Sequence, residues 1–124
     1  MTSEAVNRVR QFMRHICSAV NASEDHKKFV AQWLGPYIGK VLQVDAEGEK
    51  FYTVITKEKL WMEEGDYPSP DVIYRVKDAQ VLLDIFTGRT PFRDVMKSWD
   101  LVVIGAAHES VPLAQLIFNV MQAI

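Results

Sequence analysis

The sequence predicts an α+β fold in which helices pack on a mostly antiparallel five-stranded sheet. Three observations predict it. Apolar residues recur at helical spacing over the first third of the chain, short segments rich in β-branched and aromatic residues fill the middle, and the last third returns to helical spacing around one more strand. The resulting order is helix, helix, four strands, helix, helix, strand, helix, which is typical of an α+β layout.

Two helices are expected in the N-terminal part, residues 1–36. Ser3 is a candidate N-cap for the first helix, and Ser23, followed by two acidic residues, is a candidate for the second. Gly35-Pro36 ends the second helix. The first helix carries an apolar stripe formed by Val6, Val9, Phe12, Met13, Ile16, Cys17 and Val20.

The remainder, residues 37–124, is expected to hold the sheet and the other helices of the same single domain. Four closely spaced strands read as an antiparallel meander; they cover residues 40–45, 51–56, 60–63 and 71–76. A helix capped by Asp78 and ended by Thr87-Gly88 follows, and Thr90-Pro91 starts the next.

The end of the chain predicts a strand over residues 99–105 and a final helix opened by Ser110. No charged residue occurs from Val111 to Ile124, although a surface helix normally carries charge on its outer face. We therefore expect the outer residues, Phe118 above all, to be covered by a second copy of the chain, giving a homodimer, or by a membrane surface.

Length and charge exclude several function classes. The 124 residues correspond to one domain, and a net charge of -2 argues against nucleic acid as a partner. The single Cys17 rules out an internal disulfide framework and suits a cytoplasmic location, as do a polar N-terminus and the lack of a long apolar span. Cys17 lies on an apolar face and is expected to be inert.

No catalytic, metal or cofactor site is expected. His15, His26 and His108 lack zinc-ligand spacing, the glycines form no phosphate-binding loop, and Ser110 is better explained as a helix cap than as a nucleophile. Basic residues on the first helix, among them Arg8, Arg10 and Arg14, form either an ordinary solvated face or a contact with an anionic membrane.

Residues 39–120 resemble the sterol carrier protein type 2 family in the order and spacing of several motifs. These are the strand meander, the Pro70-Asp71-Val72-Ile73 strand, a helix that ends in Thr87-Gly88-Arg89, the Leu101-Val102-Val103-Ile104-Gly105 strand and a final apolar helix. Two features depart from the family pattern, namely the polar segment 106–112 and Trp99-Asp100 before the last strand.

The resemblance implies a hydrophobic tunnel between sheet and helices, and binding and transport of a sterol, fatty acid or fatty acyl-CoA without catalytic residues. Five Met and six Phe independently suit an adaptable apolar wall. The candidate ligand-binding residues are Phe86, Phe92, Met96, Leu101, Val103, Leu113, Leu116, Ile117 and Val120.

Two alternatives from other classes stay open. The first is a small cone-shaped α+β enzyme with an acid-base residue, Asp100 or His108, in its pocket; the strand–helix–helix–strand order of the last half argues against it. The second is a dimerisation or scaffold domain with a filled core and no ligand.

Overall fold

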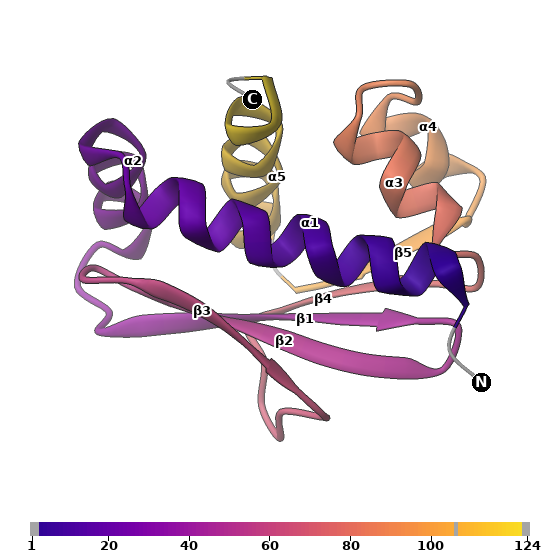
Figure 1. Cartoon of the computed structure of the whole chain (residues 1–124), viewed down its shortest axis with the longest axis horizontal. Coiled ribbons are helices and arrows are strands. Elements are labelled where there is room, and N and C mark those ends of the chain that lie inside the picture. Colours follow the sequence, from indigo (N-terminus) through magenta and orange to yellow (C-terminus); the bar gives the residue numbers. More distant parts are fainter. Residues whose placement is uncertain (1–2, 106, 123–124) are drawn as a thin grey trace.

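The computed structural model has the element order that the sequence predicts (Figure 1). It describes residues 3–105 and 107–122, and within these ranges every side chain except those of 92, 107–111 and 121–122. The elements are α1 (Glu4–Asn21), α2 (Glu24–Leu34), β1 (Gly39–Ala46), β2 (Glu49–Thr56), β3 (Leu60–Glu64), β4 (Val72–Val76), α3 (Gln80–Phe86), α4 (Phe92–Lys97), β5 (Leu101–Ile104) and α5 (Ala107–Gln122).

The five strands form one sheet in the order β3-β2-β1-β4-β5. The pairs β1–β2, β2–β3 and β4–β5 are antiparallel, so the sheet is mostly antiparallel, as predicted. The expectation that all four early strands form one meander is wrong, because β4 pairs with β1 in parallel. A parallel neighbour needs a crossover, and the loop over residues 65–71 supplies it.

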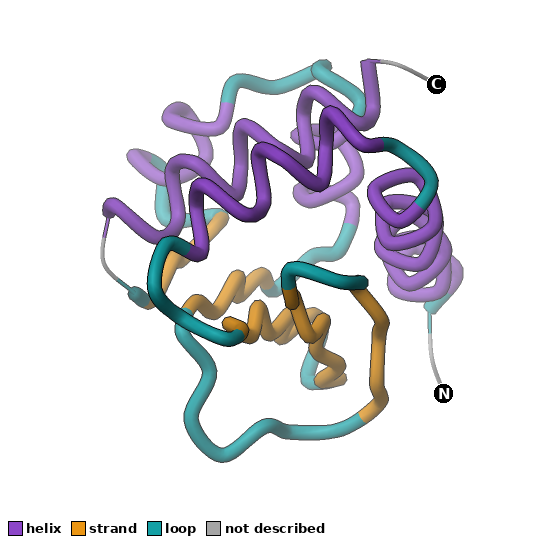
Figure 2. Tube along the Cα trace, turned by 90° about the vertical axis from the view of Figure 1, so that its left-hand side faces the viewer, coloured by secondary structure: helices purple, strands orange, loops and turns teal. Residues whose placement is uncertain are grey.

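This crossover loop passes over the sheet face that carries no helix (Figure 2). The Tyr67 N–H donates to Gln43 Oε1 at 2.9 Å, and the rings of Tyr67 and Tyr52 lie 5.2 Å apart. These contacts come from β1 and β2, so the loop covers part of the face that the helices leave open.

All the helices lie on the other face of the sheet, with α1 running across it (Figure 1). Strand alternation explains this layering. In β2 the residues Phe51, Thr53 and Ile55 are buried while their neighbours are half-buried or exposed. The paired positions Leu42 and Val44 in β1 are buried on the same side. The core therefore sits between one sheet face and the helical layer.

Local capping explains where the first helices begin. Ser3 accepts a hydrogen bond from the Val6 N–H at 3.2 Å, and Ser23 accepts one from the His26 N–H at 3.3 Å, which confirms both predicted N-caps.

Helix α3 begins with help from a distant turn. The N-cap is Ala79, one residue after the predicted Asp78; Asp78 Oδ1 accepts from the Gln80 N–H and Glu47 Oε2 accepts from the Ala79 N–H, each at 2.9 Å. Glu47 belongs to the two-residue turn between β1 and β2, where it and Gly48 have φ values of 55° and 82°. Positive φ at both positions is the hairpin geometry that matches strand twist.

Helix α5 begins earlier than the sequence suggested. The expectation that a polar connection runs to Ser110 is wrong, because the helix starts at Ala107 and contains Pro112. Ala and Glu are good helix formers, and Glu109 falls in the first turn, where the helix dipole favours an acidic residue.

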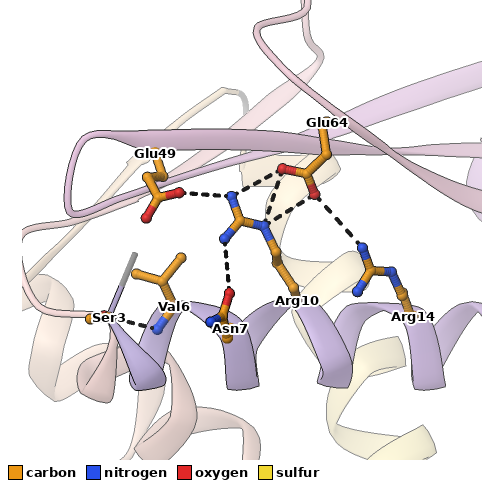
Figure 3. A network of polar contacts seen from close by, with 7 residues as sticks. All are labelled: Ser3, Val6, Asn7, Arg10, Arg14, Glu49 and Glu64. Atoms are coloured by element: carbon orange, nitrogen blue, oxygen red, sulfur yellow. Dashed lines mark hydrogen bonds and ion pairs between the residues drawn. The ribbon is translucent and has the colours of Figure 1, made fainter. Parts of the chain in front are cut away.

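One arginine joins α1 to the sheet (Figure 3). The Arg10 Nε donates to both carboxylate oxygens of Glu64 at 3.1 Å, and an η nitrogen contacts Glu49 Oε1 at 3.0 Å. The guanidinium lies over the Phe51 ring at 5.0 Å. Burial lowers the pKa of Arg10, but its hydrogen bonds to the Glu64 and Glu49 carboxylates and their negative charge outweigh this effect, and the net pKa is raised. Arg10 is thus engaged with the sheet rather than available to a membrane.

Cys17 lies in the α1–sheet interface and is buried, as predicted. Burial raises the pKa of its thiol from 9.0 to about 11, against a smaller opposing effect of the Thr53 hydroxyl. The thiolate is therefore disfavoured at neutral pH, which makes the thiol a poor nucleophile.

We predict that Arg10→Met lowers the free energy of unfolding by about 2 kcal/mol, because it leaves the Glu49 and Glu64 carboxylates without their charge-assisted hydrogen bonds. Urea unfolding at neutral pH measures this change. Arg8→Met is the matched control, since Arg8 is exposed on the same helix, and its effect should stay within about 0.5 kcal/mol. Equal effects of the two substitutions would contradict the assignment.

We also predict a pH dependence of stability from Cys17. Its folded pKa is raised, so its contribution is complete below pH 9 and is lost as the pH rises toward 11. Between about pH 8 and pH 10, urea unfolding should show the wild type losing about 1 kcal/mol more than Cys17→Ala. Parallel pH profiles for the two proteins would show that the thiol does not titrate differently on unfolding.

Candidate functional site

A pocket of about 410 Å³ lies between α3, the loop after it and α5, over one strand of the sheet. This volume is within the range of small-molecule sites. Its lining is formed by Tyr74, Ile85, Phe86, Gly88, Thr90, Pro91, Ala114, Gln115, Ile117 and Phe118. We call it the α3–α5 pocket.

The end of α3 shapes one wall of the α3–α5 pocket. The Arg89 N–H donates to the Asp84 carbonyl at 2.8 Å, and the Gly88 N–H donates to the Ile85 carbonyl at 3.0 Å. This is the Schellman pattern, which needs a left-handed residue after the helix cap, and Gly88 has φ 78°. The reversal confirms the predicted end at Thr87-Gly88 and leads the backbone along the pocket to Pro91.

Tyr74 lies beneath the pocket. It is the central residue of β4, pairs with Val44 and Val103, and is 1% exposed. Burial raises the pKa of its phenol, so the hydroxyl remains protonated over the physiological range. Tyr74 therefore brings a neutral polar group to a largely apolar cavity.

The opposite wall comes from α5. Ala114, Ile117 and Phe118 are three and four residues apart, which places them on one helix face. Gln115 donates from Nε2 to Asn119 Oδ1 at 2.8 Å. Gln115 and Phe118 are exposed, as are Gly88 and Pro91 across the pocket, so these four mark where it reaches the surface.

The candidate ligand residues occupy different places in the structure. Phe86 and Ile117 line the α3–α5 pocket. Val103 is half-buried against the core, and Met96 is 39% exposed on α4. Phe92 falls outside the described side chains. Four others are buried in the packed core: Leu101, Leu113, Leu116 and Val120.

Sequence reasoning missed most of the pocket lining. Tyr74 falls in the predicted strand over residues 71–76 and Ile85 in the helix after Asp78, but nothing local in the sequence shows that a pocket between helices lies against them. Gly88 was predicted to end one helix and Pro91 to start the next, and the hydrogen-bonded turn that makes them wall residues is visible only in three dimensions. Four further lining residues were also not predicted: Thr90, Ala114, Gln115 and Phe118.

The groups considered for catalysis lie elsewhere. Asp100 is exposed and accepts a hydrogen bond from Ser98 Oγ at 2.7 Å, and it does not line the pocket. His15 is on α1 and His26 on α2, while the side chain of His108 is not among those described. Among the side chains that the structure describes, which exclude those of His108 and Glu109, no group of three or more His, Cys, Asp or Glu could hold a metal ion.

A helix that spans a bilayer needs about 20 consecutive, mostly apolar residues. No helix in the described part of the chain is long and apolar enough to cross a membrane.

The fold was compared with known proteins to find which ones share it. No family model and no curated protein matches the chain, whereas solved structures do. The UbiJ-SCP2 ubiquinone synthesis protein superposes with a TM-score of 0.70 at 16% identity, over 97% of this chain and 95% of that one. Sterol carrier protein 2 from Yarrowia lipolytica, in its apo form, gives 0.69 at 9% identity, over 97% and 96%.

The chain has an SCP2-like fold. A third structure of this fold, palmitated SCP2L2 from Aedes aegypti, superposes with a TM-score of 0.51 at 23% identity over 79% of this chain and 92% of that one. The predicted resemblance is thus confirmed at the level of fold, with a five-stranded mixed sheet and helices on one face. At these identities the SCP2-like fold is what is shared, and the function must be argued from the α3–α5 pocket.

Proposed function

We propose that the protein binds a hydrophobic ligand of the sterol, fatty acid or fatty acyl-CoA class in the α3–α5 pocket and carries it without chemical change. The observation that carries this proposal is the pocket itself, a cavity of about 410 Å³ lined largely by apolar side chains and open to the surface beside Phe118. The SCP2-like fold supports it, as does palmitate on one structure of that fold.

Desolvation would supply the affinity. Each methylene group that leaves water contributes about 0.8 kcal/mol, so burying ten of them gives roughly 8 kcal/mol before ordering costs. Ile85, Phe86 and Ile117 offer the apolar contact, while Thr90 and Gln115 lie in the lining as neutral polar partners for a carboxyl or hydroxyl end.

We further propose that a long ligand extends the pocket into a tunnel between helices and sheet. Leu101, Leu113, Leu116 and Val120 are packed core residues here, and they would become ligand walls if the ligand moved α5 away from the sheet. Val103, Met96 and Phe92 are retained as wall candidates from the sequence.

We predict that Ile117→Trp weakens binding of the fluorescent fatty acid cis-parinaric acid by at least about tenfold, because the indole fills the α3–α5 pocket. Ile104→Trp is the matched control, since Ile104 is exposed and pairs with Ile73 on the other sheet face. Displacement by palmitate, cholesterol and palmitoyl-CoA ranks the ligand classes. A wild-type protein without probe binding, or equal binding by both variants, would rule out lipid carriage here and leave the scaffold or enzyme alternatives.

A contact of α5 with a second copy or with a membrane also remains a proposal. Phe118 is 44% exposed and lines the pocket, so a covering surface would meet it at the opening. We predict that Phe118→Asp shifts the protein toward monomer in sedimentation if α5 forms the dimer interface, and that it lowers vesicle binding if α5 meets lipid. Asn119→Asp, one residue along the helix, adds the same charge without removing apolar surface. No difference between the two variants in either assay would remove both contacts.

A further inference from the structure

The segment after the pocket, from Gly88 to Trp99, carries features that the pocket does not explain. Thr90 and Pro91 line the pocket, and α4 follows directly. In Figure 1, α4 lies at the end of the molecule opposite α2, beside α3. Helix α4 therefore begins directly after Pro91, one of the exposed residues at the opening of the pocket.

Trp99 has an unusual conformation for its size. It follows the C-cap Ser98 with φ 65°, a left-handed value that is strained for a bulky side chain, and its side chain is 77% exposed. Gly would adopt this backbone without strain. The structure thus holds a large indole in water at a position where packing within the chain gives no reason for it.

Three cations precede this indole along the chain. From Gly88 to Trp99 the sequence has Arg89, Arg93 and Lys97 against Asp94, and the exposed Asp100 that follows brings the net charge of the segment to +1 in a chain whose total is -2. All three cations are exposed, and none forms an ion pair with the described residues. By contrast, Arg10 is held by two carboxylates.

The helix spacing places two of these charges together. Arg93 and Lys97 are four residues apart on α4, so they share one face, and like charges at this spacing repel. Val95 faces the core and is 7% exposed, whereas Met96 beside the basic face is 39% exposed. An anionic surface would relieve the repulsion and cover the exposed thioether and indole at the same time.

We propose that Arg89, Arg93, Met96, Lys97 and Trp99, which we call the α4 surface, dock on the anionic face of a lipid bilayer. The mixture of exposed cations with an aromatic ring and an apolar side chain fits a headgroup region, where Trp places its amphipathic ring and Lys and Arg meet anionic lipids. Docking there brings the opening of the α3–α5 pocket to the membrane. The docking itself needs no ligand in the pocket, so it can be tested separately from the proposed function.

The experiment is co-sedimentation of the free protein with vesicles of phosphatidylcholine alone and of phosphatidylcholine mixed with phosphatidylserine. We expect binding to the mixed vesicles only, weakened by added salt. The double variant Arg93→Gln/Lys97→Gln should bind at least about tenfold more weakly. Its matched control is Lys28→Gln/Lys57→Gln, which removes two exposed cations from α2 and from the β2–β3 turn.

Trp99→Gly separates docking from packing. Relief of the left-handed strain should leave the midpoint of thermal unfolding equal to or above that of the wild type, while vesicle binding falls. Ile38→Ser is the control for an exposed apolar residue, because Ile38 is 89% exposed in the loop between α2 and β1, and it should bind vesicles like the wild type.

Several results would overturn the proposal. The first is that the wild type does not bind vesicles containing phosphatidylserine. The second is that either Trp99→Gly or the Arg93/Lys97 double variant fails to weaken vesicle binding. The third is that the control variants lose as much vesicle binding as the α4 variants. Loss of a dimer in sedimentation of the α4 variants without lipid would assign the α4 surface to a second copy of the chain instead. Failure of cis-parinaric acid binding alone would count against the proposed function and leave membrane docking standing.

Discussion

The arrangement depends on how α1 is fixed across the sheet. A sheet with helices on one face must keep that face covered, and an apolar stripe alone lets a helix slide or rotate at little cost. The Arg10 guanidinium removes this freedom, since its planar fork meets Glu64 on β3 and Glu49 on β2 while lying over Phe51. With α1 fixed over the β2–β3 side, the β4–β5 side is left for the later helices. The α3–α5 pocket lies there, over Tyr74 of β4.

The pocket exists because the elements above β4 are short and turn sharply. Helix α3 has only seven residues, and the hydrogen bonds from Gly88 and Arg89 end it and reverse the chain, so the loop over Gly88, Thr90 and Pro91 forms the rest of this wall. Its start is fixed by Glu47 of the β1–β2 turn, so both ends of α3 are set by specific polar contacts. Because both ends of α3 are fixed, the helix cannot shift into the cavity and fill it, as a freely packed helix would.

The parts that could be predicted from sequence depend on neighbours along the chain. Ser3, Ser23 and Thr87-Gly88 act within one helical turn, and alternation in β2 shows directly which residues face the helices. The parts that could not be predicted depend on distant segments. The parallel pairing of β4 with β1 is set by a crossover loop that contacts Gln43. Likewise, the burial pattern of β4 shows that Tyr74 faces inward, but not that it lies under a gap between α3 and α5.

The uncharged outer face of α5 now has a local explanation. The sequence suggested that a second chain or a membrane covers this face. The structure places Gln115 and Phe118 of that face in the lining of the α3–α5 pocket, where it opens to water. A charged side chain at either position would lose part of its hydration if an apolar ligand entered, which is unfavourable. A neutral amide held by Asn119 and an aromatic ring avoid that cost. The absence of charge at Gln115 and Phe118 therefore follows from their place in the largely apolar lining of the α3–α5 pocket, whether or not anything else covers this face.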